Sequence, residues 1–78
     1  MTRVVFLLVP GLHLLDLAGP AQVFHSAVDF GFGYRISHVG EHATVRTAQS
    51  LTVQAEPELP ALDPGDLIVV PGWRAPSG

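Results

Sequence analysis

One acidic residue near the start of the chain is its best candidate for chemistry. Asp16 stands in the leucine-rich segment LLDLAGP, shortly after an apolar run that ends at Pro10-Gly11. As a general acid or base, its carboxylate would hydrogen-bond a neighbouring thiolate or a substrate oxygen. Aspartate is also among the best residues for capping the N-terminus of a helix. The two roles are compatible, and the local sequence leaves both open.

A second apolar run, Leu67–Val70, stops at a Pro-Gly turn of the same kind. We therefore expect both turns to lie at one edge of a sheet. Open α/β sheets bind ligands at the carboxyl ends of their strands, so this edge is the expected ligand site. Gly11 is expected to serve the turn with a positive φ, and Gly72 to line the ligand site. Trp73 and Arg74 follow at once. They either cover a ligand or a partner surface, or they anchor the loop with the indole over the sheet end.

The four histidines do not predict a metal site. His38 and His42 are four residues apart, a spacing that converges on a helix, but they fall on a predicted strand and turn. The chain has no cysteine, so thiolate zinc sites are excluded. We expect these two side chains to be solvated or hydrogen-bonded, His25 to be exposed on a helix, and His13 to be structural or to line a pocket beside Asp16. No glycine-rich phosphate loop is present, so neither a metal nor a cofactor is predicted.

Length and composition narrow the class of protein. Seventy-eight residues allow one domain, and a hydrophobic fraction of 47% with 14% charged residues favours a folded core. The net charge is −3 and the four basic residues are scattered, which predicts no direct contact with nucleic acid. No apolar stretch reaches the roughly 20 residues of a membrane span. A signal peptide is not apparent. We expect a cytoplasmic protein that has no contact with a membrane.

The hydrophobic pattern of the sequence predicts several strands and one helix. Apolar runs without alternation at 3–9 and 67–70 are typical of strands buried on both faces of a parallel sheet. A further strand is expected at 34–39 and a small hairpin at 44–47 and 51–55. The acidic, proline-rich stretch 56–66 is expected to be a solvated connection with at most one helical turn at 58–62, and 73–78 a loop. This order favours an α/β fold.

Apolar residues at helical spacing follow the first strand. They are Leu14, Leu17, Ala18, Ala21, Phe24 and Val28. Pro20 complicates the beginning of this helix, because a proline in a helix interior removes a hydrogen bond and clashes with the preceding turn. Either a single turn at 14–18 precedes a main helix that begins at Pro20, or one helix kinks at Gly19-Pro20. We favour the first. The segment 29–33 is expected to end the helix.

Together these motifs resemble the N-terminal half of the ThiJ/PfpI superfamily, the class I glutamine-amidotransferase-like α/β domains. FLLVPG-x-x-LLDLAGPAQVF and DLIVVPG-W carry the resemblance, which is strongest to the variant at the front of AraC-type transcription regulators, the GlxA-like group. It implies a partial flavodoxin-like sandwich with a parallel sheet. At the position of Asp16, superfamily enzymes carry an acid that faces the nucleophile. At Gly72, a Gly-Gly pair often donates backbone N–H groups to the pocket. Trp73 departs from that pair and would narrow the pocket.

The resemblance also implies a function. The family's cysteine nucleophile would lie beyond Gly78, as would the helix-turn-helix domain of the regulators, so residues 1–78 look like the N-terminal part of a larger domain. The leading hypothesis is a ligand-sensing or dimerisation module of an AraC-type regulator, with a small effector molecule and a homodimer of the full-length protein as its partners. The alternative is a fragment of a cysteine-dependent enzyme, isonitrile-hydratase-like or hydrolase-like. In that case Asp16 would be catalytic, but the chain contains no nucleophile for it. A truncated product without function is a third hypothesis.

Overall fold

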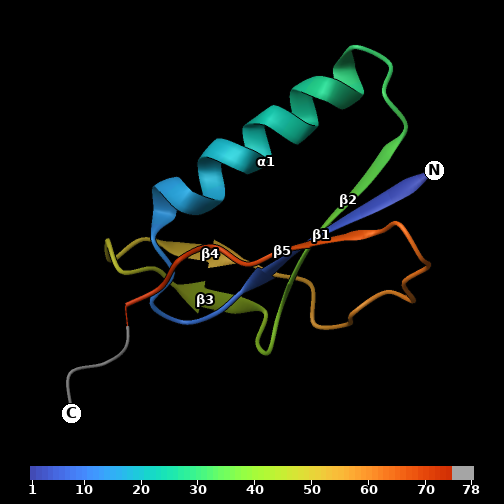
Figure 1. Ribbon diagram of the computed structural model, residues 1–78. Coiled ribbons are helices and arrows are strands. Elements are labelled where there is room, and N and C mark those ends of the chain that lie inside the picture. Colours follow the sequence, from blue (N-terminus) through green and yellow to red (C-terminus); the bar gives the residue numbers. More distant parts are fainter. Residues whose placement is uncertain (75–78) are drawn as a thin grey trace.

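Residues 1–74 form one helix and five strands, in the order that the sequence predicts. The computed structural model describes residues 1–74 and is drawn in Figure 1. The predicted loop 73–78 therefore lies largely outside the described residues. In chain order the elements are β1 (Thr2–Leu8), α1 (Leu14–Asp29), β2 (Tyr34–Gly40), β3 (Thr44–Arg46), β4 (Thr52–Gln54) and β5 (Leu67–Val69). No helix appears at 58–62. Within residues 1–74, the one helix is not long and apolar enough to cross a membrane.

Three strands form a parallel sheet with β1 in the middle. The strand order is β2-β1-β5, and both neighbours run parallel to β1. In the register, Val4 pairs with Ile36 on one side and with Leu67 on the other. The short strands β3 and β4 pair antiparallel as a separate hairpin. This arrangement confirms the predicted α/β class with a parallel sheet and is consistent with a partial flavodoxin-like fold.

The core lies between β1 and α1. Val4 and Phe6 are fully buried, Leu8 nearly so, and all three belong to one hydrophobic cluster with Leu17 of α1. Phe24 reaches the same cluster from the middle of the helix and meets Phe6 edge to face, with 6.2 Å between ring centroids. Figure 1 shows α1 running across one side of the sheet. Val5, on the opposite face of β1, is also fully buried, so the central strand is buried on both faces, as its continuous apolar sequence predicts.

The helix is continuous from Leu14 to Asp29, with Pro20 inside it. The favoured prediction, a main helix that begins at Pro20, is therefore wrong, and a single helix is correct. Pro20 cannot donate to the carbonyl of Asp16, a defect that typically costs about 3 kcal/mol in a helix interior. Leu17 and Phe24 lie on either side of Pro20 and enter the same core. We infer that this tertiary packing holds the two halves in one helix, since most helical stability in proteins comes from packing.

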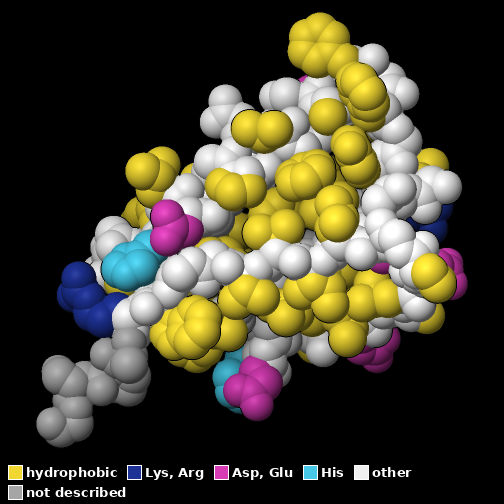
Figure 2. All heavy atoms as spheres, viewed as in Figure 1, with side chains coloured by type: hydrophobic (Ala, Val, Ile, Leu, Met, Phe, Trp, Pro, Cys, Tyr) yellow, Lys and Arg dark blue, Asp and Glu magenta, His cyan; other side chains and the backbone are white. Residues whose placement is uncertain are grey.

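The edge strand β5 is only partly buried, contrary to expectation: Val69 packs against the core, whereas the residues around it are exposed. Leu67 is 43% exposed, Ile68 49% and Val70 48%. The cause is the strand order, because among residues 1–74 no strand pairs with the outer edge of β5. Figure 2 shows hydrophobic side chains on both sides of this segment. The apolar run therefore has the sequence of a central strand in the position of an edge strand.

The connection 56–66 is exposed for most of its length, as predicted, but one of its acids has a structural role. The carboxylate of Asp66 accepts the backbone N–H of Arg3 at 2.9 Å and that of Asp63 at 2.7 Å. These hydrogen bonds, that of Asp63 first, hold the pKa of the Asp66 carboxyl below its usual 3.8. Asp66 thus ties the connection to the first strand and is not merely solvated.

Candidate functional site

The loops that follow β1 and β5 meet at one edge of the sheet. The N–H of His13 donates to the carbonyl of Gly72 at 2.7 Å, and the N–H of Arg74 donates to the carbonyl of Gly11 at 2.9 Å. Between these bonds, Leu12 and Trp73 form an antiparallel bridge. The two Pro-Gly turns therefore share one edge, as the sequence predicts.

Gly11 has the conformation that its turn requires. Its φ is +82°, and a Cβ at this position would lie 2.6 Å from the carbonyl oxygen of Arg74. Both the backbone conformation and the close approach of the second loop therefore demand glycine.

Asp16 lies in the first turn of α1 but does not cap the helix. The N-cap residue is His13, and its side chain makes no capping hydrogen bond. The helix-cap interpretation of Asp16 is therefore wrong. Its side chain is exposed, and its Oδ2 lies 2.7 Å from the point that a Cβ of residue 72 would occupy. Asp16 and Gly72, two predicted site residues, are thus brought together.

Gln49, which the sequence did not single out, completes the helix end. Its Oε1 accepts the N–H of Leu14 at 2.7 Å, so a hairpin residue satisfies the first helical donor in place of a local cap. That bond fixes which end of the amide faces His13, so Nε2 lies 3.4 Å from Nδ1 of the imidazole. Because the Nε2 amide group of Gln49 can only donate, this contact is a hydrogen bond when Nδ1 of His13 is the acceptor. The contact spans 35 residues of sequence, and no local pattern announces it.

The hairpin holds Gln49 in place through its own turn. Thr47 is buried; its hydroxyl donates to the carbonyl of Leu51 at 2.7 Å and accepts the N–H of the same residue at 3.2 Å. The N–H of Ala48 donates to the carbonyl of Leu12 at 2.8 Å. The turn is therefore closed on itself and fastened to the loop that precedes α1.

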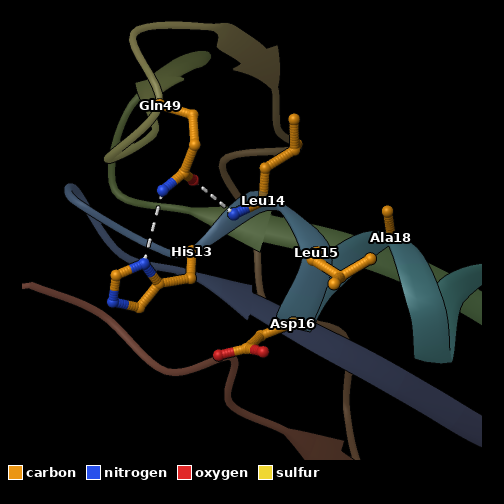
Figure 3. Close-up of a pocket in the computed structure, with 6 residues that line it drawn as sticks. All are labelled: His13, Leu14, Leu15, Asp16, Ala18 and Gln49. Atoms are coloured by element: carbon orange, nitrogen blue, oxygen red, sulfur yellow. Dashed lines mark hydrogen bonds between the residues drawn. The ribbon is translucent and has the colours of Figure 1, made fainter.

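An open cavity of about 550 Å³ lies at this helix end (Figure 3). Figure 3 shows the His13 ring and the Asp16 carboxylate on the side of the loop after β5. The lining residues are His13, Leu14, Leu15, Asp16, Ala18 and Gln49. Gly72 borders Asp16 without lining the cavity, and Trp73 does not line it either. Trp73 is 57% exposed, so its indole is not a packed anchor.

The lining offers binding groups but no nucleophile. Asp16 makes no side-chain hydrogen bond with residues 1–74, so its carboxylate remains free to accept one from a ligand. Leu15 and Ala18 supply an apolar wall. The chain has no cysteine. Residues 1–74 also contain no cluster of three histidines and acids that could hold a metal. This arrangement suits the binding of a small molecule with a polar group and an apolar body.

His38 is the histidine whose environment differs most from expectation. Its ring stacks on Phe6, with 5.4 Å between centroids, and on His25, with 5.7 Å. The residue is half-buried, and within the described part of the chain its ring makes no hydrogen bond. Neither ring nitrogen is buried without a partner, so both remain accessible to solvent, as predicted; the stacking was not predicted. His42 is exposed, as predicted.

Comparison with known proteins supports the fold and leaves the function open. No family model matches the chain. A protein of Streptomyces lividans, described as an uncharacterized protein in the cpoL 5′ region, is 42% identical over 77 residues. The crystal structure of an AraC family transcriptional regulator from Pseudomonas putida covers 95% of the chain with a TM-score of 0.76 and 20% identity. The chain spans 55% of the length of the first protein and 48% of the second.

Proposed function

We propose that this chain is the front part of an AraC-type transcription regulator and that it binds a small effector at the start of α1. The observation that carries the proposal is the likeness of nearly the whole chain to the Pseudomonas putida regulator. The motifs LLDLAGP and VVPGW, which resemble the ThiJ/PfpI-like domain at the front of such regulators, support it. A homodimer and a DNA-reading domain outside these residues belong to the same proposal.

Ligand recognition is the role that residues 1–74 can serve on their own. Asp16 borders a cavity, yet no group of residues 1–74 stands beside it as a nucleophile, and the chain has no cysteine. Trp73 occupies the position where the enzymes of the superfamily often have a second glycine. A carboxylate without a reacting partner can still orient a ligand through a charge-assisted hydrogen bond. We therefore assign Asp16 to effector recognition.

The coding sequence that follows codon 78 tests the regulator proposal. We expect the remainder of the domain and then a helix-turn-helix. A domain that ends soon after a cysteine at a strand-to-helix elbow would support the enzyme instead, and an immediate stop codon would support a truncated product.

Effector binding can be tested through the single tryptophan. Trp73 is the neighbour of Gly72, and the Asp16 carboxylate lies where a Cβ of residue 72 would be, so the tryptophan emission should change when a compound fills the cavity. We expect a screen of small polar metabolites to yield a compound whose effect is weakened at least tenfold by Asp16→Asn. Asp29→Asn, at the other end of the same helix, is the matched control and should leave binding unchanged. Equal binding by both variants would remove Asp16 from the site.

A further inference from the structure

Three aromatic rings form a column between the sheet and the helix. Phe6 of β1 stacks on His38 of β2 with an interplanar angle of 15°, and His38 stacks on His25 of α1 with an angle of 6°. Phe6 is fully buried, His38 half-buried and His25 exposed, so the column runs from the core to the surface. Its outer contact joins α1 directly to β2.

The column places two titratable rings face to face. Burial is the main cause that lowers the pKa of His38 below its usual 6.5, and the neighbouring His25 lowers it further. Glu56, which follows β4 and whose N–H donates to the carbonyl of His38 at 2.7 Å, opposes both with its negative charge. From β1 the column receives only the uncharged ring of Phe6. The arrangement therefore disfavours a proton on His38 while the rings are stacked.

We propose that the stacked pair His25–His38 is a proton-sensitive latch, which holds α1 on the sheet at neutral pH and releases it in mild acid. The neutral rings pack against one another and against Phe6. Once His38 takes up a proton, a charge lies half-buried beside a second imidazole, and separation of α1 from β2 relieves both the desolvation and the repulsion. The first turn of the same helix carries Leu15 and Asp16, so release would also open the cavity wall.

The sign of the pH effect follows from the lowered pKa. The unfolded chain binds a proton at His38 at a higher pH than the folded chain does. The stability that neutral His38 contributes is therefore present above pH 6.5 and is lost as the pH falls below it towards the folded pKa. Within this window, uptake of one proton raises the unfolding equilibrium constant by up to about tenfold per pH unit.

Urea unfolding of the chain, followed by circular dichroism between about pH 5 and about pH 8, tests the latch over the range in which histidine titrates. We expect the wild type to show this acid sensitivity. His38→Gln should remove most of it, and His25→Gln only part, because burial is the larger cause. His38→Phe keeps an aromatic ring in the column and cannot titrate, so it should be folded and insensitive. His42→Gln, at an exposed site outside the column, is the matched control.

Amide hydrogen exchange distinguishes release of the helix from general unfolding. The ratio of protection at Val28 of α1 to protection at Phe6 of β1 cancels most of the intrinsic pH dependence of exchange. We expect this ratio to fall several-fold on acidification in the wild type and to stay constant in His38→Phe. Equal pH slopes in wild type and His38→Gln would overturn the proposal. So would loss of the slope in His42→Gln, or parallel loss of protection in helix and sheet.

Discussion

The carboxylate of Asp16 occupies the space beside Gly72 in which any other residue would place its side chain. The separation between Oδ2 and that Cβ position is 2.7 Å, which is too short for two non-bonded heavy atoms. The backbone at Gly72 does not have a positive φ, so this glycine is needed for space and not for conformation. The loop after β5 thus fixes where the best site candidate on α1 can lie.

Gly72→Ala should therefore displace the Asp16 carboxylate while costing little stability. The conflicting atom ends a short, exposed side chain that can rotate away, so we expect a loss below about 1 kcal/mol, less than typical overpacking of a core. The ¹³C chemical shift of the Asp16 carboxyl carbon should change. Gly33→Ala, where a Cβ would meet nothing within 4 Å, should change neither quantity.

Gly11→Ala provides the opposite comparison. There the added Cβ would meet a backbone carbonyl at 2.6 Å, and φ is +82°. A strained residue of this kind costs on the order of 1–3 kcal/mol. Thermal unfolding should therefore rank Gly11→Ala well below Gly72→Ala. If Gly72→Ala were the less stable of the two, the Asp16 carboxylate would not rotate away from the added Cβ as we expect.

Gln49→Ala should destabilise α1 from a distance. The substitution removes the oxygen that accepts the N–H of Leu14, and loss of a capping acceptor typically costs about 1 kcal/mol. It also removes the contact between the Gln49 amide and the His13 ring, so Trp73 emission should shift. Chemical unfolding measures the first effect. Gln54→Ala, on the exposed side of β4, removes the same groups where they make no hydrogen bond within residues 1–74 and should be nearly neutral.

Sequence periodicity predicted the elements because each depends on local pattern. The run 3–9 has the continuous apolar character of a central strand, and β1 is central. The same argument failed for 67–70, because burial of a strand depends on its neighbours and not on its own residues. The prediction of a main helix that begins at Pro20 was wrong for a related reason. Helix propensity favours a break there, whereas the core contacts of Leu17 and Phe24 favour continuity.

The candidate site was predictable in part. Asp16 and Gly72 follow two parallel strands, and the carboxyl ends of parallel strands share an edge, so their proximity could be inferred. Gln49 could not be found, because its contact with Leu14 is set by how the hairpin folds back onto the loop after β1. Spacing within one element does not indicate the pairing of His25 with His38, because this contact joins a helix to a strand.

The exposed edge of β5 predicts self-association of the chain. An edge strand with apolar residues and no protecting charge invites pairing with another strand. We expect sedimentation to show species larger than the monomer and Ile68→Lys to reduce them strongly. Val23→Lys on α1, where the wild-type side chain is 67% exposed, is the matched control and should leave association unchanged. A strictly monomeric wild type would contradict the prediction.

The hydrogen bonds of Asp66 predict a loss of stability at a more acidic pH than the loss that His38 causes. Its hydrogen bonds from the N–H groups of Asp63 and Arg3 favour the charged carboxylate, so its pKa in the folded chain lies below 3.8. The unfolded chain therefore binds the proton at the higher pH, and the contribution of Asp66, present above pH 3.8, is lost as the pH falls towards the folded value. The melting temperature should decline accordingly over this range.

Asp66→Asn tests this assignment, because the two N–H groups are accepted by different carboxylate oxygens and the amide replaces one of these oxygens with an NH2 group that can only donate. The variant should melt at a lower temperature than the wild type at neutral pH and should lose less stability on acidification. Asp63→Asn retains the backbone N–H that Asp66 accepts, so it should behave as the wild type does. Since Asp66 joins the start of β1 to the residue before β5, its loss should loosen the alignment of these two strands. Besides lowering the melting temperature, Asp66→Asn should therefore accelerate amide exchange more at Ile68 of β5 than at Ser37 of β2. Equal acceleration at both sites would contradict a tie specific to β5.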